Sequence, residues 1–337
     1  MRWQTLKREK AYFVAKKQHL SVRAYSFSFR KYRAKGEEKI IPLDEKILIK
    51  YADGSEAVYP SALEIFEDFV VCSDKTADKE DLQQLFRCEM NPAYKGETDR
   101  YRYLIFSVFS GYYGFASEVI DRKTKEVVHS RTRDEADVKE FYVMVVVPKT
   151  VDGITPTRGL IFFQEIGVYG VKTVTANYLQ DFVSSHLRLT FRTQNLAPDF
   201  YLNKLFEKGI IKKIRLARNI VSGDSTDRLY GQSIGREERA FVPIGVTSEF
   251  KRKLRHVAAD HYNVYTFDDI DYSEVKMEVT IGGRTRTVNL HGLEDLSIEE
   301  SLPDELLMAD GTVSLDGFLE HMHSVAEEYL DHLPCNV

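Results

Sequence analysis

Three consecutive stretches decide the fold: GLIFFQEIGVYGVKTVTANYLQDFV (159–183), SSHLRLTFRTQNLAPDFYLNKLFEKG (184–209) and IIKKIRLAR (210–218). The first opens with an apolar run, 160–166, which is too short for a helix and has glycines on both sides. A run of this length and setting is typical of a buried β-strand. The apolar spacing then changes between helical and strand-like, so the stretches together predict strand, helix, strand, helix and strand.

The two helices of this unit have recognisable ends. Apolar residues recur at helical spacing after the glycine-punctuated turn, and Thr173 or Thr175 is expected to cap the first helix. Alternation predicts a strand over 187–192. The second helix is expected to begin at Pro198, a favourable first-turn residue, and to end at Gly209, a favourable C-cap.

The last strand of the unit, 210–217, gathers the basic residues. Its alternation places Lys213 and Arg215 on one face. Lys212 then lies among the inward positions or at a β-bulge. The inward face is expected to comprise Ile210, Ile214 and Leu216.

Length and composition indicate a globular α+β protein of two lobes. The chain has 337 residues, 43% of them hydrophobic and 12% aromatic, which is enough for two cores. We expect a mixed β-sheet domain with a basic N-terminal segment over 1–153, and a basic α+β domain over 154–337. The run FYVMVVV (141–147) is nearly all apolar and predicts a central strand buried on both faces. The segment 149–157 is either a domain boundary or a long loop between two strands of one sheet, and we favour the loop.

The other expected elements follow from alternation, helical spacing and turn residues. They are strands over 22–30, 47–51 and 101–109, helices over 61–70 and 81–88, a loop over 91–100, a hairpin over 114–120 and 126–130, a polar loop over 222–238, a strand over 240–246, a helix over 248–260, a hairpin over 275–281 and 284–290, and a terminal helix over 314–333.

Several classes of protein are not indicated. No apolar run approaches the ~20 residues of a membrane span, and no apolar segment follows the basic N-terminus as in a secretory signal. The three widely spaced cysteines argue against a disulfide framework and a zinc site, so a reducing cytosol is the simplest location. Nucleotide-binding glycine motifs and the common hydrolase and metalloprotease motifs do not occur, and no cofactor is expected. His321 and His323 are two apart on a helix, which favours surface histidines over a shared metal.

Charge is distributed unevenly along the chain. Residues 1–39 contain twelve Lys and Arg against three Glu, whereas residues 292–337 contain twelve Asp and Glu and no Lys or Arg. This asymmetry suggests an anionic partner for the basic part, or docking of one part on the other. Two solvated faces that merely differ remain the alternative. The acidic terminal helix is expected to pack on the basic lobe, or to mimic DNA until it is displaced.

The basic residues of the second half suggest a phosphate-binding patch. If the strand over 210–218 and the helix over 248–260 share one face, they can neutralise several phosphates, and binding would be salt-sensitive and largely independent of sequence. Taken alone, the helix face reads as solvated. The candidate nucleic-acid-binding residues are Lys212, Lys213, Arg215, Arg218, Lys251, Arg252, Lys253 and Arg255.

A metal-dependent nuclease is the alternative from a different class. Such enzymes place an acid on one strand and Glu-x-Lys on the next, where the acids hold a divalent ion. Asp269 or Asp271, followed by Glu274 and Lys276, resembles this arrangement. The acid and Glu274 are only a few residues apart, and an alternating exposed strand face explains the pattern as well. A protein–protein adaptor, in which the basic patches meet an acidic partner, is the third hypothesis.

The order of elements resembles the RexA family, the phage-exclusion proteins of lambdoid prophages. The similarity covers roughly 101–333 and is carried by YLIFSVFSGYYGFASEVID (103–121), RGLIFFQEIGVYGVKTVTANYLQDFV (158–183) and SEFKRKLRHVAAD (248–260). It implies a homodimeric, sequence-nonspecific DNA-binding sensor of an antiphage, abortive-infection system, acting without catalysis and paired with a membrane effector protein. DNA contact would fall on Lys251, Arg252 and Arg255. The chain departs from the family in its long basic N-terminus and in the segment 222–238.

Overall fold

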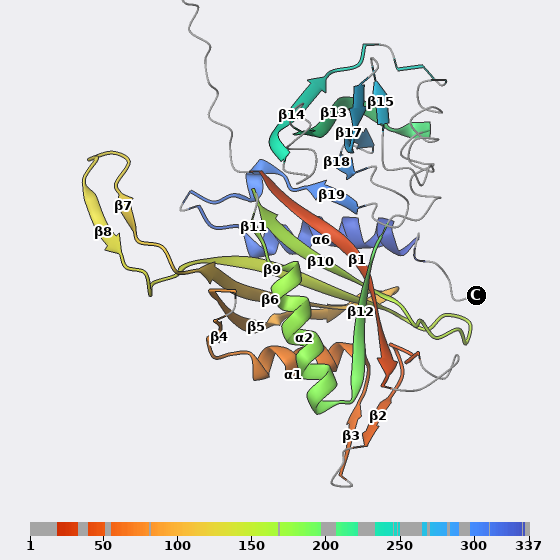
Figure 1. The fold of residues 1–337 in the computed structure, drawn as a ribbon. Helices are drawn as coiled ribbons and strands as arrows, with labels where there is room; N and C mark the ends of the chain where they lie inside the picture. The colour runs from red at the N-terminus through yellow and green to blue at the C-terminus, as the bar shows by residue number, and fades with distance from the viewer. Residues whose placement is uncertain are drawn as a thin grey trace, which may run out of the picture.

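The fold is mainly β, and α+β overall, and is built on one large antiparallel sheet with three helices in the described part (Figure 1). The computed structural model describes residues 19–32, 40–50, 55–80, 82–167, 169–196, 207–221, 233–244, 246, 247, 249, 265–267, 270–281, 284–289, 297–309, 311–331 and 333.

Thirteen strands of the described residues belong to the large sheet. Its order is β14 (Ser233–Phe241), β13 (Ile210–Val221), β17 (Glu274–Ile281), β18 (Arg284–Asn289), β19 (Ser297–Ser301), β1 (Leu20–Lys31), β10 (Gly159–Ile166), β9 (Asp137–Pro148), β6 (Tyr101–Tyr112), β5 (Gln84–Glu97) and β4 (Ala77–Lys79), with β11 (Tyr169–Gly170) beside β10 and β12 (Leu189–Asn195) beside β1. Three two-stranded sheets pair β2 (Ile47–Lys50) with β3 (Glu56–Tyr59), β7 (Ser117–Ile120) with β8 (Val127–Arg131), and β15 (Tyr265–Phe267) with β16 (Ile270–Tyr272).

Helices cover both faces of the middle of the sheet. α1 (Ala62–Cys72) and α2 (Lys172–His186) pack on one face, and α6 (Leu315–Leu330) packs on the other (Figure 1). A short 3₁₀ turn, η2 (Asp304–Leu306), precedes α6. α1 begins with a capping box, because Ser61 accepts the Leu63 N–H and Glu64 accepts the Ser61 N–H.

The expectation that 141–147 is a central strand buried on both faces is confirmed by β9. Phe141, Val143, Val145 and Val147 enter the core beneath α1 and α2, while the residues between them enter the core beneath α6. Successive side chains of a strand point to opposite faces of the sheet. Because helices cover both faces here, both sets of β9 side chains must be apolar.

Two details of the fold-deciding stretch differ from expectation. α2 begins at Lys172, and its N-cap is Val171 with no side-chain cap; Thr175 is buried within the helix. In β13 the inward residue is Ile211, which is 5% exposed, whereas Ile210 is 60% exposed. The expected helix 198–209 lies almost entirely outside the described residues.

The helix predicted over 81–88 is wrong, because this segment enters β5. Gln84, Phe86 and Cys88 are buried at every second position, the period of a strand paired with β6. The loop expected after residue 91 is also strand, since a register shift between Met90 and Lys95 accommodates the Asn-Pro segment within β5.

A second lobe is not evident. The segment 149–157 connects β9 to β10, which lie side by side in the sheet, so the favoured long loop is confirmed. The division expected between residues 153 and 154 falls inside this loop.

Every described strand pair is antiparallel, so the expectation of a mixed sheet was wrong. The strand predicted over 240–246 ends at Phe241, because β14 begins within the expected polar loop, at Ser233.

At its β13 end the sheet has a third core of its own. β17 and β18 form the predicted hairpin, with Ile281 opposite Arg284. Ile214, Met277 and Val288 are buried on one face of these strands. The opposite face carries charged residues, and this is where the predicted basic strand is found.

Candidate nucleic-acid interface

The solvent side of β14, β13 and β17 forms a surface that we call the charged face. Cross-strand register places Lys213 opposite Glu278 and Arg215 opposite Lys276, away from the core side of the same strands. Side chains of registered partners lie on the same face of a sheet, so these groups are neighbours. The charged face comprises Lys213, Arg215, Arg236, Glu274, Lys276 and Glu278.

A β-bulge adds Lys212 to this surface. The pairing of β13 with β17 shifts between Ile211, opposite Val279, and Lys213, opposite Glu278. The extra residue, Lys212, has no partner on β17 and is exposed. A bulge changes the direction of one side chain relative to strict alternation. Two successive lysines can therefore lie between the buried residues Ile211 and Ile214. Of the two positions considered from the sequence, the bulge is the one observed.

The arginines of the charged face are held by glutamates. Arg215 donates to Glu278 at 2.5 Å, and Arg236 donates through both terminal nitrogens to Glu274 at 2.8 Å. The hydrogen bonds that Arg236 donates to Glu274 raise the pKa of Arg236. Both guanidinium groups are therefore partly neutralised by groups of their own sheet. No ion pair to Lys212 or Lys213 is found within the described residues.

Arg218 lies on the other side of β13 from Lys213 and Arg215. Its guanidinium group is 6.0 Å from the ring centre of Tyr272, a fully buried core residue, and it donates to Glu237 at 2.7 Å. Hydrogen bonds from Arg218 and Arg239 lower the pKa of Glu237. The predicted set from β13 is thus divided between two faces, as an odd spacing along a strand requires.

The other predicted basic residues, Lys251, Arg252, Lys253 and Arg255, lie outside the described residues, as does the expected helix 248–260. Arg192, a basic residue that precedes this set in the chain, lies on β12, which pairs with β1. β1 is four positions from β13 in the sheet order, so the structure separates Arg192 from the charged face.

The carboxylate of the nuclease alternative is already engaged. Both oxygens of Glu274 accept from Arg236, and Lys276 lies 3.8 Å from the same carboxylate. Asp269 and the Asp271 side chain lie outside the described residues. Within the described ranges, no three His, Cys, Asp or Glu side chains gather so as to hold a metal ion. His323 on α6 is hydrogen-bonded instead to Tyr101 at 2.7 Å.

Sequence reasoning missed the strand that supplies the counter-charges. Arg236, Glu237 and Arg239 fall at or beside the expected polar loop 222–238, but the structure places them on β14. The run GREERAF carries no apolar alternation: β14 is the edge strand, and within this run Phe241 is the residue that packs against the core. The mixture of arginines and glutamates in this run, next to a basic strand, was the available signal.

Further ion pairs lie nearer the middle of the sheet, on β1, β10 and β19. His19 Nε2 lies 3.3 Å from Glu299, and Arg23 bonds Glu165 at 3.0 Å and approaches Glu299 at 3.7 Å. The hydrogen bond with Glu299 raises the pKa of His19. Burial raises the pKa of Glu165, although Arg23 opposes the effect.

The acidic terminal helix, α6, is part of the core. Four of its own side chains are at most 2% exposed and face the sheet: Phe318, Met322, Val325 and Tyr329. Burying four such side chains contributes roughly 6–12 kcal/mol, which is comparable to the stability of a whole domain. Displacing α6 in order to free a basic surface would therefore cost more than a few phosphate contacts return.

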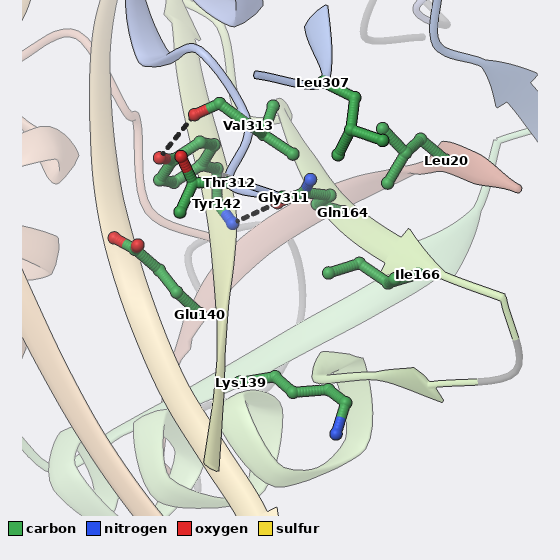
Figure 2. A pocket seen from close by; sticks show the side chains of 10 residues that line it. All are labelled: Leu20, Lys139, Glu140, Tyr142, Gln164, Ile166, Leu307, Gly311, Thr312 and Val313. Carbon is green, nitrogen blue, oxygen red and sulfur yellow. Dashed lines mark hydrogen bonds between the residues drawn. The ribbon is translucent and has the colours of Figure 1, made fainter. Parts of the chain in front are cut away.

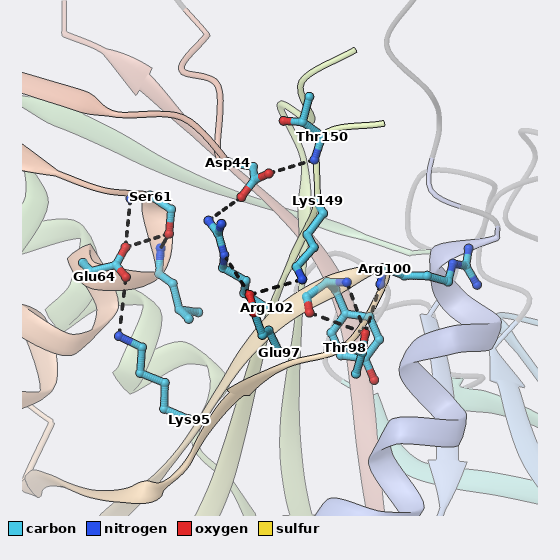
Figure 3. Close-up of polar contacts among 12 residues, drawn as sticks. Asp44, Ser61, Glu64, Lys95, Glu97, Thr98, Arg100, Arg102, Lys149 and Thr150 are labelled. Carbon is cyan, nitrogen blue, oxygen red and sulfur yellow. Dashed lines mark hydrogen bonds and ion pairs between the residues drawn. The ribbon is translucent and has the colours of Figure 1, made fainter. Parts of the chain in front are cut away.

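The acids of α6 also have fixed partners. Glu328 accepts from Arg284 at 2.6 Å and from Arg286 at 2.8 Å, both on β18. Arg100, at the β5–β6 turn, pairs with Glu327 of the same helix and with Asp331, its C-cap; Figure 3 shows this arginine beside Thr98 at the turn. The sequence expectation was packing on the basic lobe. The ion pairs of α6 do reach β18, but its apolar face packs on strands from both expected lobes, among them β6, β9 and β10.

No protein-family model matches the sequence, and a search of curated proteins found no significant match. The resemblance to the RexA family therefore stays a prediction. No helix of the described residues is long and apolar enough to cross a membrane.

Proposed function

We propose that the protein binds duplex nucleic acid through the phosphate backbone, without sequence preference and without catalysis. The observation that carries the proposal is the bulge in β13, which presents Lys212 and Lys213 together at the charged face. Lysine ammonium groups bind phosphates as point charges and release condensed counterions.

The ion pairs made by the arginines of β13 limit how many phosphates this strand can bind. Arg215 and Arg218 each bind a glutamate, so β13 supplies two cations without an ion-pair partner among the described residues, instead of the four expected from sequence. Each phosphate contact steepens the salt dependence by about 0.9 in the slope of log K against log salt. β13 therefore accounts for a slope of about 1.8, and the predicted helix 248–260 would add the rest.

The antiphage setting of the proposal rests on the RexA resemblance alone. That resemblance also suggests a homodimer and a membrane effector that responds to the DNA-bound protein. A nonspecific backbone contact suits such a sensor, because it recognises DNA as a polymer and not as a particular site.

A salt titration of binding to a labelled random-sequence duplex tests the proposal. The wild type is expected to bind at low salt and to weaken steeply as salt rises. Lys212→Gln/Lys213→Gln should lower the slope by about 1.8. The matched control is Lys123→Gln/Lys125→Gln, which removes two lysines from the exposed turn between β7 and β8 and should leave the slope unchanged. Absence of binding at low salt would overturn the proposal.

A gain-of-affinity variant makes the test sharper. Glu278→Gln removes the partner of Arg215 at 2.5 Å and frees a guanidinium on the charged face. We expect tighter binding and a slope steeper by about 0.9. Lys251→Glu/Arg252→Glu separately tests the helix expected from sequence. If wild type does not bind DNA but retains an acidic protein partner, the adaptor hypothesis takes its place.

A further inference from the structure

A cavity of about 250 Å³ opens where β9 and β10 part (Figure 2). The two strands pair from Val146 opposite Leu160 to Val143 opposite Phe163. Beyond that point β9 continues with β6, whereas β10 continues with β1 and β11. The gap lies on the α6 side of the sheet, beneath the segment 307–313.

Gln164 stands at the point of separation and is only partly satisfied. Its Oε1 accepts the N–H of Tyr142 at 2.8 Å, in place of the main-chain acceptor that continued pairing would supply. This bond fixes the orientation of the amide, so Nε2 is the remaining donor. The side chain is 1% exposed, and Nε2 has no hydrogen-bond partner in the part of the chain that the structure describes. A buried donor without a partner is costly, about 1–3 kcal/mol, and a bound acceptor would remove that cost.

The rest of the lining is apolar or already paired. Leu20, Ile166 and Val313 supply aliphatic walls. The Tyr142 hydroxyl donates to the carbonyl of Val313 at 3.0 Å, and burial raises the pKa of Tyr142 to about 12, so this group is neutral.

The two charged residues of the lining are engaged with neighbours. Lys139 is paired with Asp137, and Glu140 accepts from Ser107 at 2.6 Å. Figure 2 shows Lys139 and Glu140 lower in the view than Tyr142 and Gln164. Both charged groups are therefore engaged by neighbours, and Gln164 Nε2 is a donor of the lining that has no partner among the described residues.

We propose that this cavity is a binding site for a small uncharged ligand, with an apolar ring and one carbonyl or ring-nitrogen acceptor directed at Gln164 Nε2. The volume equals that of about eight water molecules at ~30 Å³ each, which suits a single aromatic ring with a short substituent. Sites of this kind are mostly apolar, with a few placed polar groups that fix the ligand's orientation. Because the cavity roof runs directly into α6, its occupancy would also stabilise that helix.

Three probes of one shape test the chemistry: acetophenone, ethylbenzene and benzoate. Their affinities are measured by saturation-transfer NMR and by the rise in melting temperature of the full chain. Acetophenone is expected to bind about fivefold more tightly than ethylbenzene, as one ordinary hydrogen bond predicts, and benzoate is expected not to bind. Equal affinity for acetophenone and ethylbenzene, or no saturation by either at millimolar concentration, would overturn the proposal and leave a cavity filled by water.

Two variants locate the binding. Leu307 lies in the roof and is 45% exposed, so Leu307→Trp should fill the cavity without disturbing Gln164 and should abolish binding of both neutral probes. Met308→Trp is the matched control, since Met308 is 46% exposed and does not line the cavity; binding should be unchanged. Gln164→Met should make acetophenone no better than ethylbenzene. Acetophenone binding that survives Leu307→Trp refutes the assignment, even if Gln164→Met fails to fold.

Discussion

Replacing Arg286 by methionine should destabilise the fold through a carboxylate that remains buried. Arg286 is 0% exposed and Glu300 is 1% exposed, and their Nε and Oε2 atoms are 2.7 Å apart. Without Arg286, the nearest cation of Glu300 is Arg284, whose Nε lies 3.9 Å from Oε1. Removing one member of a buried ion pair costs about 3–5 kcal/mol, because the other charge stays uncompensated.

The loss should depend on pH in a defined direction. Burial already raises the pKa of Glu300 above its ordinary value of 4.5, although Arg286 opposes the effect. Without Arg286 the folded state holds this proton more tightly than the unfolded chain does. Stability then falls as pH rises from the unfolded value to the folded one, by up to about 1.4 kcal/mol per unit, and returns on acidification.

Urea denaturation followed by circular dichroism at pH 5 and pH 8 measures both effects. Arg286→Met should lower the free energy of unfolding at pH 8 by about 3–5 kcal/mol, and by less at pH 5. The matched control is Arg100→Met, which also removes a partner of α6 but is 47% exposed, and should cost at most about 1 kcal/mol. Arg286→Met/Glu300→Met should recover part of the loss. A cost below about 1 kcal/mol, with no pH dependence, would refute the buried network.

Three further outcomes are expected. The His19 imidazole should titrate by NMR at higher pH than in Glu299→Gln, and the stability from this contact should be present below the unfolded pKa and lost as pH rises through the folded one; equal midpoints would contradict the pairing. Phe318→Ala should lower the free energy of unfolding by about 3–5 kcal/mol, because the ring is fully buried beneath α6; a loss under 1 kcal/mol would show that α6 is displaceable. Gly111→Ala should destabilise β6 against β9, because the added Cβ would lie 2.1 Å from the carbonyl of Asp137; an unchanged melting temperature would refute that close approach.

The sequence predicted best those elements in which the spacing of apolar residues directly reflects which side chains are buried. The apolar run 141–147 and the helical spacing of α6 both identified core segments, because each residue's period matches the layer that it meets. The segment 81–88 was misread because Leu82 and Leu85 mimic helical spacing, although the burial has period two. Short apolar groups do not separate the two periods.

The candidate site was predicted less completely, for a long-range reason. One strand's alternation placed Lys213 on the solvent face and left a bulge at Lys212 as one of two alternatives, but the glutamates that bind the arginines of β13 come from β14 and β17. Arg286 lies in the predicted hairpin, but its full burial was not predicted, because its partners Glu300 and Glu328 come from distant segments. Partners brought together only by the sheet order leave no trace in a single strand's periodicity.

The position of β1 has a consequence for synthesis of the chain. This strand is made long before β19, and the Ser21–Arg23 part of one of its edges is closed only when β19 arrives; Ser301 contacts His19 across 282 residues. At ribosomal rates of about 5–20 residues per second, β1 waits roughly 15–55 s for that partner. An open strand edge during this interval is a template for pairing with another nascent chain. Chains that terminate before β19 should therefore collect in aggregates, and holdase chaperones should engage the protein early in translation.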